Sequence, residues 1–209
     1  MRGLPVPDRQ TVDPSVSRSK FEREVAQFRA MEDAYRRKGW LLLDATFPEV
    51  VVAFAATKVT PPAILGAVLV DFTDYDLQPL SVRFVNPFTR EPVTRRHLPM
   101  SMPRRPLMPG MPPEAVMAMI QQGMPLADCI QANGPDDLPF LCLPGVREYH
   151  DNPAHTGDPW LLHRASGVGS LAFILDKIWT YGVNPFDQYQ VQLHVQVTGV
   201  MASAHAIPE

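Results

Sequence analysis

Side chains of the types that carry out chemistry gather between residues 142 and 163. This stretch holds three of the six histidines and one of the two cysteines of the chain. In the order Cys-x5-Glu-x-His-x4-His-x7-His, its candidates are Cys142, Glu148, His150, His155 and His163. Thiol, imidazole and carboxylate groups at this density are typical either of a metal site or of a nucleophile with its base and orienting acid. The pattern alone does not choose between them.

A zinc site is one possibility, because thiolate, imidazole and carboxylate are the usual Zn²⁺ ligands, at about 2.0–2.3 Å. The spacing matches no established zinc signature, neither a paired C-x2-C nor H-E-x-x-H. A complete donor set is nevertheless present, and it consists of Cys142, Glu148, His150 and His155, with His163 as a further donor.

A cysteine nucleophile is the second possibility. A thiolate attacks carbonyls and thioesters well once a neighbouring base lowers the thiol pKa from its free value of about 8.5. Each of the three histidines is a candidate base for Cys142, and Glu148 is a candidate to orient the imidazole. Against both roles, the apolar text from Leu138 to Leu143 is also typical of a buried, inert thiol.

Composition excludes several other classes. A formal charge of −3 and a pI near 6.1 give no electrostatic case for nucleic acid as a partner. No apolar run approaches the roughly 18 residues of a membrane span. Two cysteines are too few for a disulfide scaffold, so a reducing, cytoplasmic setting is expected. The sequence has no G-x-S-x-G motif, P-loop or dinucleotide fingerprint.

An amphipathic helix is predicted after a polar, flexible lead-in over residues 1–17. Ser19 and Glu22 form a capping box, and Gly39 is a plausible end. Its apolar face consists of Phe21, Val25, Phe28, Met31 and Tyr35.

Four short apolar runs then predict strands at 40–47, 50–57, 64–72 and 80–85. The brief connections between them favour an antiparallel meander. The run from Val50 to Ala56 is apolar throughout, so a helix is the alternative there.

The second half is less regular. An insertion at 97–125 holds seven of the 23 prolines and seven of the 10 methionines, with a short helix expected at 113–122. Its methionines either fill gaps in the core or, over 100–124, form a docking surface for a partner. Further on, the pattern predicts a helix over 165–181 and, from strict alternation, a strand over 188–198. A single domain over 18–200 and a tail at 201–209 are expected.

This order of elements resembles ubiquitin-conjugating enzymes. The segment from Asp71 to Phe84 is similar to that family's Phe-Pro-x-x-Tyr-Pro-x-x-Pro-Pro-x-Val-x-Phe text, and residues 140–143, Phe-Leu-Cys-Leu, are similar to its Ile-Cys-Leu at the thioester cysteine. Trp160 resembles its downstream Trp-Ser-Pro. The resemblance covers about residues 19–182 and implies an α+β fold with an N-terminal helix, a four-stranded antiparallel meander and a helix after the cysteine loop, to which this chain adds a C-terminal strand.

Three departures qualify this resemblance. The family's His-Pro-Asn is missing, which leaves Asn133, nine residues before the cysteine, as the candidate for that asparagine's oxyanion role. The segment between Cys142 and Trp160 is longer than usual and carries Glu148, His150 and His155. The chain also ends in a strand instead of helices. These features resemble a divergent bacterial group with a Cys-Glu-His-His signature, described as a predicted metal-binding domain and associated with ubiquitin-like conjugation genes.

The leading function implied by the resemblance is a transferase. Cys142 is expected to receive a ubiquitin-like modifier as a thioester from an activating enzyme and pass it to a protein acceptor, with no cofactor. His150 or His155 acts as base, and Asn133 or backbone N–H groups stabilise the oxyanion. The alternatives are a zinc-binding domain and a non-catalytic scaffold of the same fold.

Overall fold

Two consecutive helices precede the sheet in the computed structural model, which describes residues 11–104 and 110–188. Helix α1 (Pro14–Ala30) begins five residues before the predicted Ser19, because the Asp13 side chain accepts a hydrogen bond from Ser15 N at 2.9 Å and Pro14 occupies the first turn. After a break at Met31, α2 (Glu32–Lys38) runs to Gly39, which has the left-handed conformation expected of a helix end (φ 92°).

The four predicted strands form one antiparallel sheet in the order β1-β2-β3-β4. The predicted meander is therefore confirmed, and the run from Val50 to Ala56 is a strand. The bounds are β1 (Trp40–Thr46), β2 (Glu49–Ala56), β3 (Ala63–Asp71) and β4 (Ser81–Val85).

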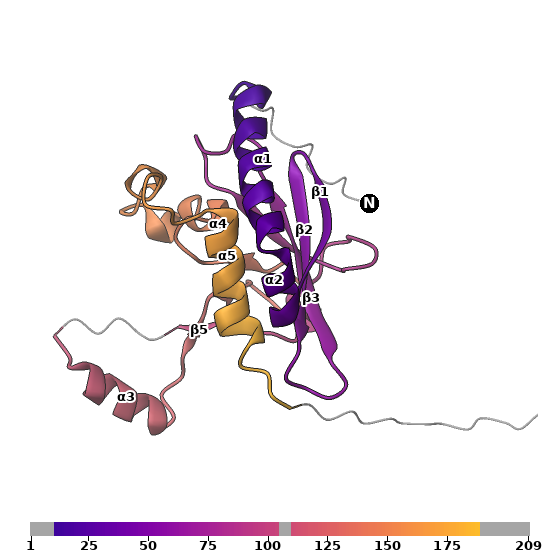
Figure 1. The fold of residues 1–209 in the computed structure, drawn as a ribbon. Coiled ribbons are helices and arrows are strands. Elements are labelled where there is room, and N and C mark those ends of the chain that lie inside the picture. The colour runs from indigo at the N-terminus through magenta and orange to yellow at the C-terminus, as the bar shows by residue number, and fades with distance from the viewer. Residues whose placement is uncertain (1–10, 105–109, 189–209) are drawn as a thin grey trace, which may run out of the picture.

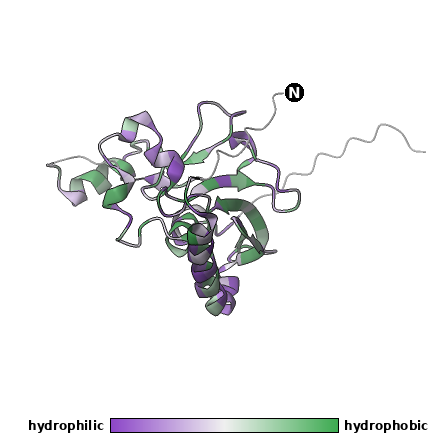
Figure 2. Cartoon of the chain, turned by 90° about the horizontal axis from the view of Figure 1, so that it is seen from above, coloured by the Kyte–Doolittle hydropathy of each residue, from purple (hydrophilic) through white to green (hydrophobic). Residues whose placement is uncertain are grey.

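The main core lies between this sheet and the helices on one of its faces (Figure 1). Phe21, Val25 and Phe28 of α1 are buried there against alternate residues of the strands. Figure 2 shows hydrophobic colouring concentrated on the strands, whereas α1, seen end-on, carries hydrophilic stretches on its surface. Helix α5 (Leu171–Ile178) completes this layer and packs beside α1.

Helix α5 begins six residues later than the predicted start at 165. Gly167 and Gly169 both have positive φ values, 82° and 80°, which a right-handed helix cannot contain. Ser170 then caps the helix by accepting from Phe173 N at 3.4 Å. A π-helical turn, η4 (Trp179–Val183), ends this region.

Between β4 and α5 the chain forms short elements joined by long connections. Helix α3 (Pro113–Gln121), close to the predicted 113–122, stands away from the body in Figure 1. The others are η1 (Arg95–His97), β5 (Pro103–Arg104), β6 (Ala127–Asp128), β7 (Ile130–Gln131), β8 (Phe140–Leu141), α4 (Arg147–His150), η2 (Pro153–His155) and η3 (Trp160–Leu162).

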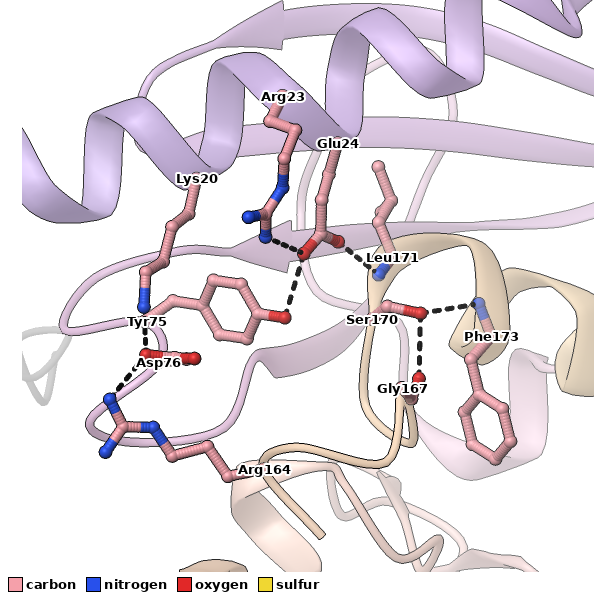
Figure 3. A network of polar contacts seen from close by, with 10 residues as sticks. All are labelled: Lys20, Arg23, Glu24, Tyr75, Asp76, Arg164, Gly167, Ser170, Leu171 and Phe173. Atoms are coloured by element: carbon pink, nitrogen blue, oxygen red, sulfur yellow. Dashed lines mark hydrogen bonds and ion pairs between the residues drawn. The ribbon is translucent and has the colours of Figure 1, made fainter.

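The carboxylate of Glu24 joins three separate parts of the fold (Figure 3). Glu24 is only 6% exposed; one oxygen accepts from the Tyr75 hydroxyl at 2.8 Å and the other from Leu171 N at 2.7 Å. Burial raises the pKa of Glu24, and the two hydrogen bonds oppose that shift. Helix α1, the β3–β4 connection and the start of α5 are thereby fixed to one another.

A second polar centre lies one residue further along the same connection. The Asp76 carboxylate contacts Lys20 of α1 and Arg164, the latter at 3.0 Å (Figure 3). The backbone oxygen of Asp76 accepts from Trp160 Nε1 at 3.0 Å. The segment that carries the histidines is therefore held against the β3–β4 connection.

The architecture is α+β, as expected. The predicted C-terminal strand over 188–198, the tail at 201–209 and residues 1–10 of the lead-in lie outside or at the edge of the described residues. Residues 14–17 of the expected lead-in belong to α1, and Ser17 is buried there.

We predict that Glu24→Ala lowers the free energy of unfolding by about 2–4 kcal/mol, because it leaves the Tyr75 hydroxyl and Leu171 N–H buried without a partner. Glu24→Gln should cost far less, since an amide can accept from Leu171 N–H while donating to the Tyr75 oxygen. Urea unfolding followed by tryptophan fluorescence measures both, with Glu22→Ala, an exposed site on the same helix, as control.

The stabilities of the wild type and of Glu24→Gln should also depend differently on pH. A raised pKa in the folded state means that Glu24 stabilises the fold fully below its unfolded value of 4.5 and loses this contribution as the pH rises through the folded value. The stability of the wild type relative to Glu24→Gln should therefore decrease from acid to neutral pH. An unchanged difference would contradict the assignment.

Candidate functional site

Cys142 lies at the open end of a short hairpin. Strands β7 and β8 pair Ile130 with Leu141, and just beyond this pair Cys142 N donates to Cys129 O at 2.7 Å. Cys129 N in turn donates to Met102 O at 2.9 Å, next to β5. The cysteine is thus fixed by backbone pairing to a neighbouring strand that is itself paired.

His155 is the histidine that meets this thiol. Its Nε2 lies 3.3 Å from Cys142 Sγ, within hydrogen-bond reach for sulfur. His155 ends η2, a turn in which the Asn152 side chain accepts from Ala154 N at 3.0 Å. His155 is one of three histidines that the sequence offers as candidate bases, and it is the one with a described hydrogen bond to the Cys142 sulfur.

A tyrosine and an aspartate hold the His155 ring in place. The Tyr149 ring stacks on His155 with 4.0 Å between the ring centroids and an interplanar angle of 21°. The Tyr149 hydroxyl donates to Asp158 Oδ2 at 2.8 Å, and Asp158 N donates to His155 O at 3.0 Å. Among the described residues, nothing hydrogen-bonds His155 Nδ1. Orientation therefore comes from stacking and backbone contact.

The Cys142 thiol is neutral in this environment. The residue is 1% exposed, and burial raises the pKa of the thiol, while the charge of Arg104 opposes the shift. Because a neutral thiol is a weak nucleophile, attack from Cys142 requires its proton to pass to a base during the reaction. His155 is the base in position to take it.

His150 has a different environment. Its Nε2 accepts from Gly145 N at 3.0 Å, which requires the hydrogen on Nδ1, where Asp158 O lies at 2.9 Å as acceptor. Burial lowers the pKa of His150, in keeping with this neutral form. Both ring nitrogens are occupied in fixing the loop after Cys142, so His150 is not placed to take a proton from the sulfur.

His163 contacts the other carboxylate oxygen of Asp158, with 2.6 Å between Nε2 and Oδ1. This hydrogen bond and the one from Tyr149 lower the pKa of Asp158. Asp158 thereby gathers Tyr149, His150 and His163 around itself. The sequence offered no signal that singled out Asp158 or Tyr149. Their roles depend on ring stacking and on the path of the loop, and neither produces a recognisable residue spacing in the sequence.

Glu148 points away from the imidazoles. Its carboxylate contacts the Ser81 hydroxyl and accepts from Val82 N at 3.2 Å, so it attaches α4 to β4. Burial raises the pKa of Glu148, and the Ser81 hydrogen bond opposes that shift. The structure thus brings Glu148 to the sheet instead of to a histidine.

Asn133 is exposed in the loop between β7 and β8. It lies two residues beyond the end of β7, and no described hydrogen bond joins it to Cys142.

The donors named for zinc do not converge. Within residues 11–104 and 110–188, no group of three or more His, Cys, Asp or Glu side chains is arranged to hold a metal ion. Glu148 is engaged with β4 and His150 with the backbone. Of these donors only His155 has a described hydrogen bond to Cys142, whereas structural zinc takes four ligands. None of the helices in the described part of the chain is long and apolar enough to span a membrane.

Comparison with known proteins identifies relatives without an assigned activity in their names. The Y4jH-like family model, describing the Y4jH family, matches residues 12–186. A Sinorhizobium fredii protein named "Uncharacterized protein y4jH" is 56% identical over 205 residues, which cover 98% of this chain and all of that protein. The residues that the family model matches span the stretch from Cys142 to His163.

We predict a pH dependence of stability that is specific to His150. Because its folded pKa is lowered, His150 stabilises the fold above its unfolded value of 6.5, and the contribution is lost as the pH falls through the folded value. Urea unfolding of wild type and His150→Gln should show a difference that is constant above pH 6.5 and shrinks in acid. A difference that grows in acid would show that the ring is charged in the folded state.

Proposed function

Since the chain belongs to the Y4jH-like family, whose model includes the whole described site, we propose that this protein is a cysteine-dependent acyl transferase of the ubiquitin-conjugating type. Cys142 carries the C-terminal acyl group of a ubiquitin-like modifier as a thioester and passes it to an amine or hydroxyl of a protein acceptor. The observation that carries the proposal is the 3.3 Å contact between Cys142 Sγ and His155 Nε2.

The architecture supports this activity over a generic thiol site. A helix, an antiparallel four-stranded meander, a cysteine after irregular connections and a further helix follow in the order that the resemblance to ubiquitin-conjugating enzymes implies. The β3–β4 connection, whose text carries much of that resemblance, packs against Trp160 and α1. These features agree with the proposal at the level of the α+β fold.

Loading begins with attack of Cys142 Sγ on the activated carbonyl carbon that the activating enzyme presents. His155 Nε2 takes the thiol proton as the S–C bond forms, and the leaving group receives that proton as its own bond to carbon breaks. In the transfer step an acceptor amine or hydroxyl attacks the thioester carbonyl, His155 takes the acceptor's proton, and the Cys142 sulfur leaves and is reprotonated.

Arg104 supplies positive charge near the reacting sulfur. Burial raises the pKa of Cys142, of Cys129 and of Tyr149, and the positive charge of the Arg104 guanidinium opposes that rise in all three. Negative charge develops on sulfur and on the carbonyl oxygen during attack, and a nearby cation stabilises both. Under this proposal Arg104 takes the electrostatic role for which the sequence offered Asn133.

Access to the sulfur requires local movement. Cys142 is 1% exposed, and the segment that carries His155 lies beside it with mostly exposed side chains at 151–159. An acyl donor therefore reaches Cys142 through a local movement of this segment that keeps His155 Nε2 within reach of the sulfur, as loops around other active sites move.

We predict that a synthetic peptide thioester with a C-terminal glycine acylates Cys142. Mass spectrometry should find one peptide adduct on the 142-containing fragment, removed by dithiothreitol, and Cys142→Ala should form none. Cys142→Ser should give an adduct that resists dithiothreitol, because it is an oxygen ester.

The role of the base has its own test with the same probe. His155→Asn should slow acylation about 10²–10⁴-fold, the range for loss of general base catalysis. His97→Asn, an exposed histidine on η1, is the matched control and should acylate at the wild-type rate. Equal rates for wild type and His155→Asn would contradict the assignment of His155 as base. Conjugates formed by Cys142→Ala with its own activating enzyme and modifier would contradict the transferase proposal itself.

A further inference from the structure

The two cysteines of the chain lie opposite each other. In the β7–β8 hairpin Ile130 pairs with Leu141, and Cys129 and Cys142 are the residues that flank this pair. A backbone hydrogen bond from Cys142 N to Cys129 O at 2.7 Å joins the two cysteines directly. Residues hydrogen-bonded across antiparallel strands have Cα atoms about 5.5 Å apart.

That separation lies inside the Cα–Cα range of about 4.4–6.8 Å that disulfides span. Both thiols are free, Cys129 being partly exposed and Cys142 buried. Cys129 N donates to Met102 O at 2.9 Å, so the backbone of Cys129 is held by hydrogen bonds to two neighbouring segments. The two cysteines are therefore neighbours in the folded chain, as a disulfide between them requires.

Electrostatics connect the same two sulfurs. Burial raises the pKa of each thiol, the Arg104 charge opposes the shift in both, and ionised Cys142 raises the pKa of Cys129 further. Of the two, Cys142 alone has a described hydrogen bond to an imidazole, that of His155. The two cysteines therefore differ: Cys142 is next to the base His155, whereas Cys129 is more exposed to solvent.

We infer that Cys129 is a resolving cysteine, and that a hydroperoxide converts the pair into a Cys129–Cys142 disulfide that reversibly blocks the site. Redox-responsive cysteines commonly lie next to such a partner. The regulatory meaning rests on the proposed function of Cys142, whereas the disulfide itself does not.

The chemistry balances with hydrogen peroxide as the oxidant. Cys142 Sγ attacks one peroxide oxygen while His155 takes the thiol proton; the O–O bond breaks, and the departing hydroxide takes that proton and leaves as water. The Cys142 sulfenic acid is then attacked by Cys129 Sγ, the S–O bond breaks, and the hydroxyl leaves as a second water with the Cys129 proton. Two thiols lose two electrons, and one peroxide becomes two waters.

The disulfide blocks acylation of Cys142 and also protects this sulfur from irreversible oxidation. Without a resolving thiol, a sulfenic acid proceeds to sulfinic acid, which ordinary thiols do not reverse. With Cys129 in place, dithiothreitol restores both thiols. The acyl acceptor sulfur is unavailable in the meantime.

The test treats purified full-length protein with hydrogen peroxide, blocks remaining thiols and digests it without reductant. Wild type should yield a fragment that links the two cysteines within one chain, two hydrogens lighter than its separate parts and cleaved by dithiothreitol. Cys129→Ser should yield no linked fragment and several-fold more Cys142 sulfinic acid. Cys142→Ser should yield neither product, and near-isosteric replacement at both sites preserves folding.

The inference is overturned if wild type and Cys129→Ser accumulate the same amount of sulfinic acid, or if cysteines link only between chains. Acylation of reduced Cys129→Ser by the peptide thioester reports separately on the proposed function. A linked fragment without acylation would support the disulfide inference and contradict the proposed transferase function. Acylation without a linked fragment would support the transferase function and contradict the disulfide inference.

Discussion

The buried carboxylate of Glu24 is the constraint on which the position of the site depends. Burying a carboxylate costs several kcal/mol, and here it is offset by charge-assisted hydrogen bonds from the Tyr75 hydroxyl and Leu171 N, each contributing about 1.5–3 kcal/mol. These donors belong to the β3–β4 connection and to the start of α5. The connection then positions α4, because Arg147 N donates to Leu80 O at 2.8 Å. The histidine segment is thus fixed through contacts that begin inside α1.

The polar residues around Cys142 divide into two groups by what they contact. Glu148 attaches α4 to β4 through its hydrogen bond with Val82 N, and His150 fixes the loop after the cysteine through its hydrogen bond with Gly145 N. His155 keeps its Nε2 for the sulfur, while stacking on Tyr149 holds its plane. A cluster that looks uniform in sequence therefore contains mainly structural groups and one candidate proton acceptor, which is why counting ligand-type residues overstates the case for a metal.

The regular part of the fold was predictable because burial imposes period two on strands and period 3.6 on helices, so the meander and the burial of Phe21, Val25 and Phe28 follow from the sequence. Met31, expected on the same apolar face, is instead 50% exposed at the break between α1 and α2. The start of α5 was missed because positive φ at Gly167 and Gly169 interrupts an apolar pattern that runs past it. Which histidine contacts Cys142 depends on the conformation of an irregular loop, and hydrophobic periodicity does not predict such conformations. Opposition of Cys129 and Cys142 likewise depends on hairpin register, with 12 residues between them in sequence.

A crystal structure of the protein after reaction with the glycine peptide thioester would show whether Cys142 is the acylated residue. We expect continuous density from Cys142 Sγ to the peptide carbonyl carbon, with His155 Nε2 within hydrogen-bond reach of the sulfur or of a water beside the carbonyl. Density for a metal ion bridging Cys142 and His155 at about 2.0–2.3 Å, or an unmodified thiol with the peptide on another side chain, would contradict it.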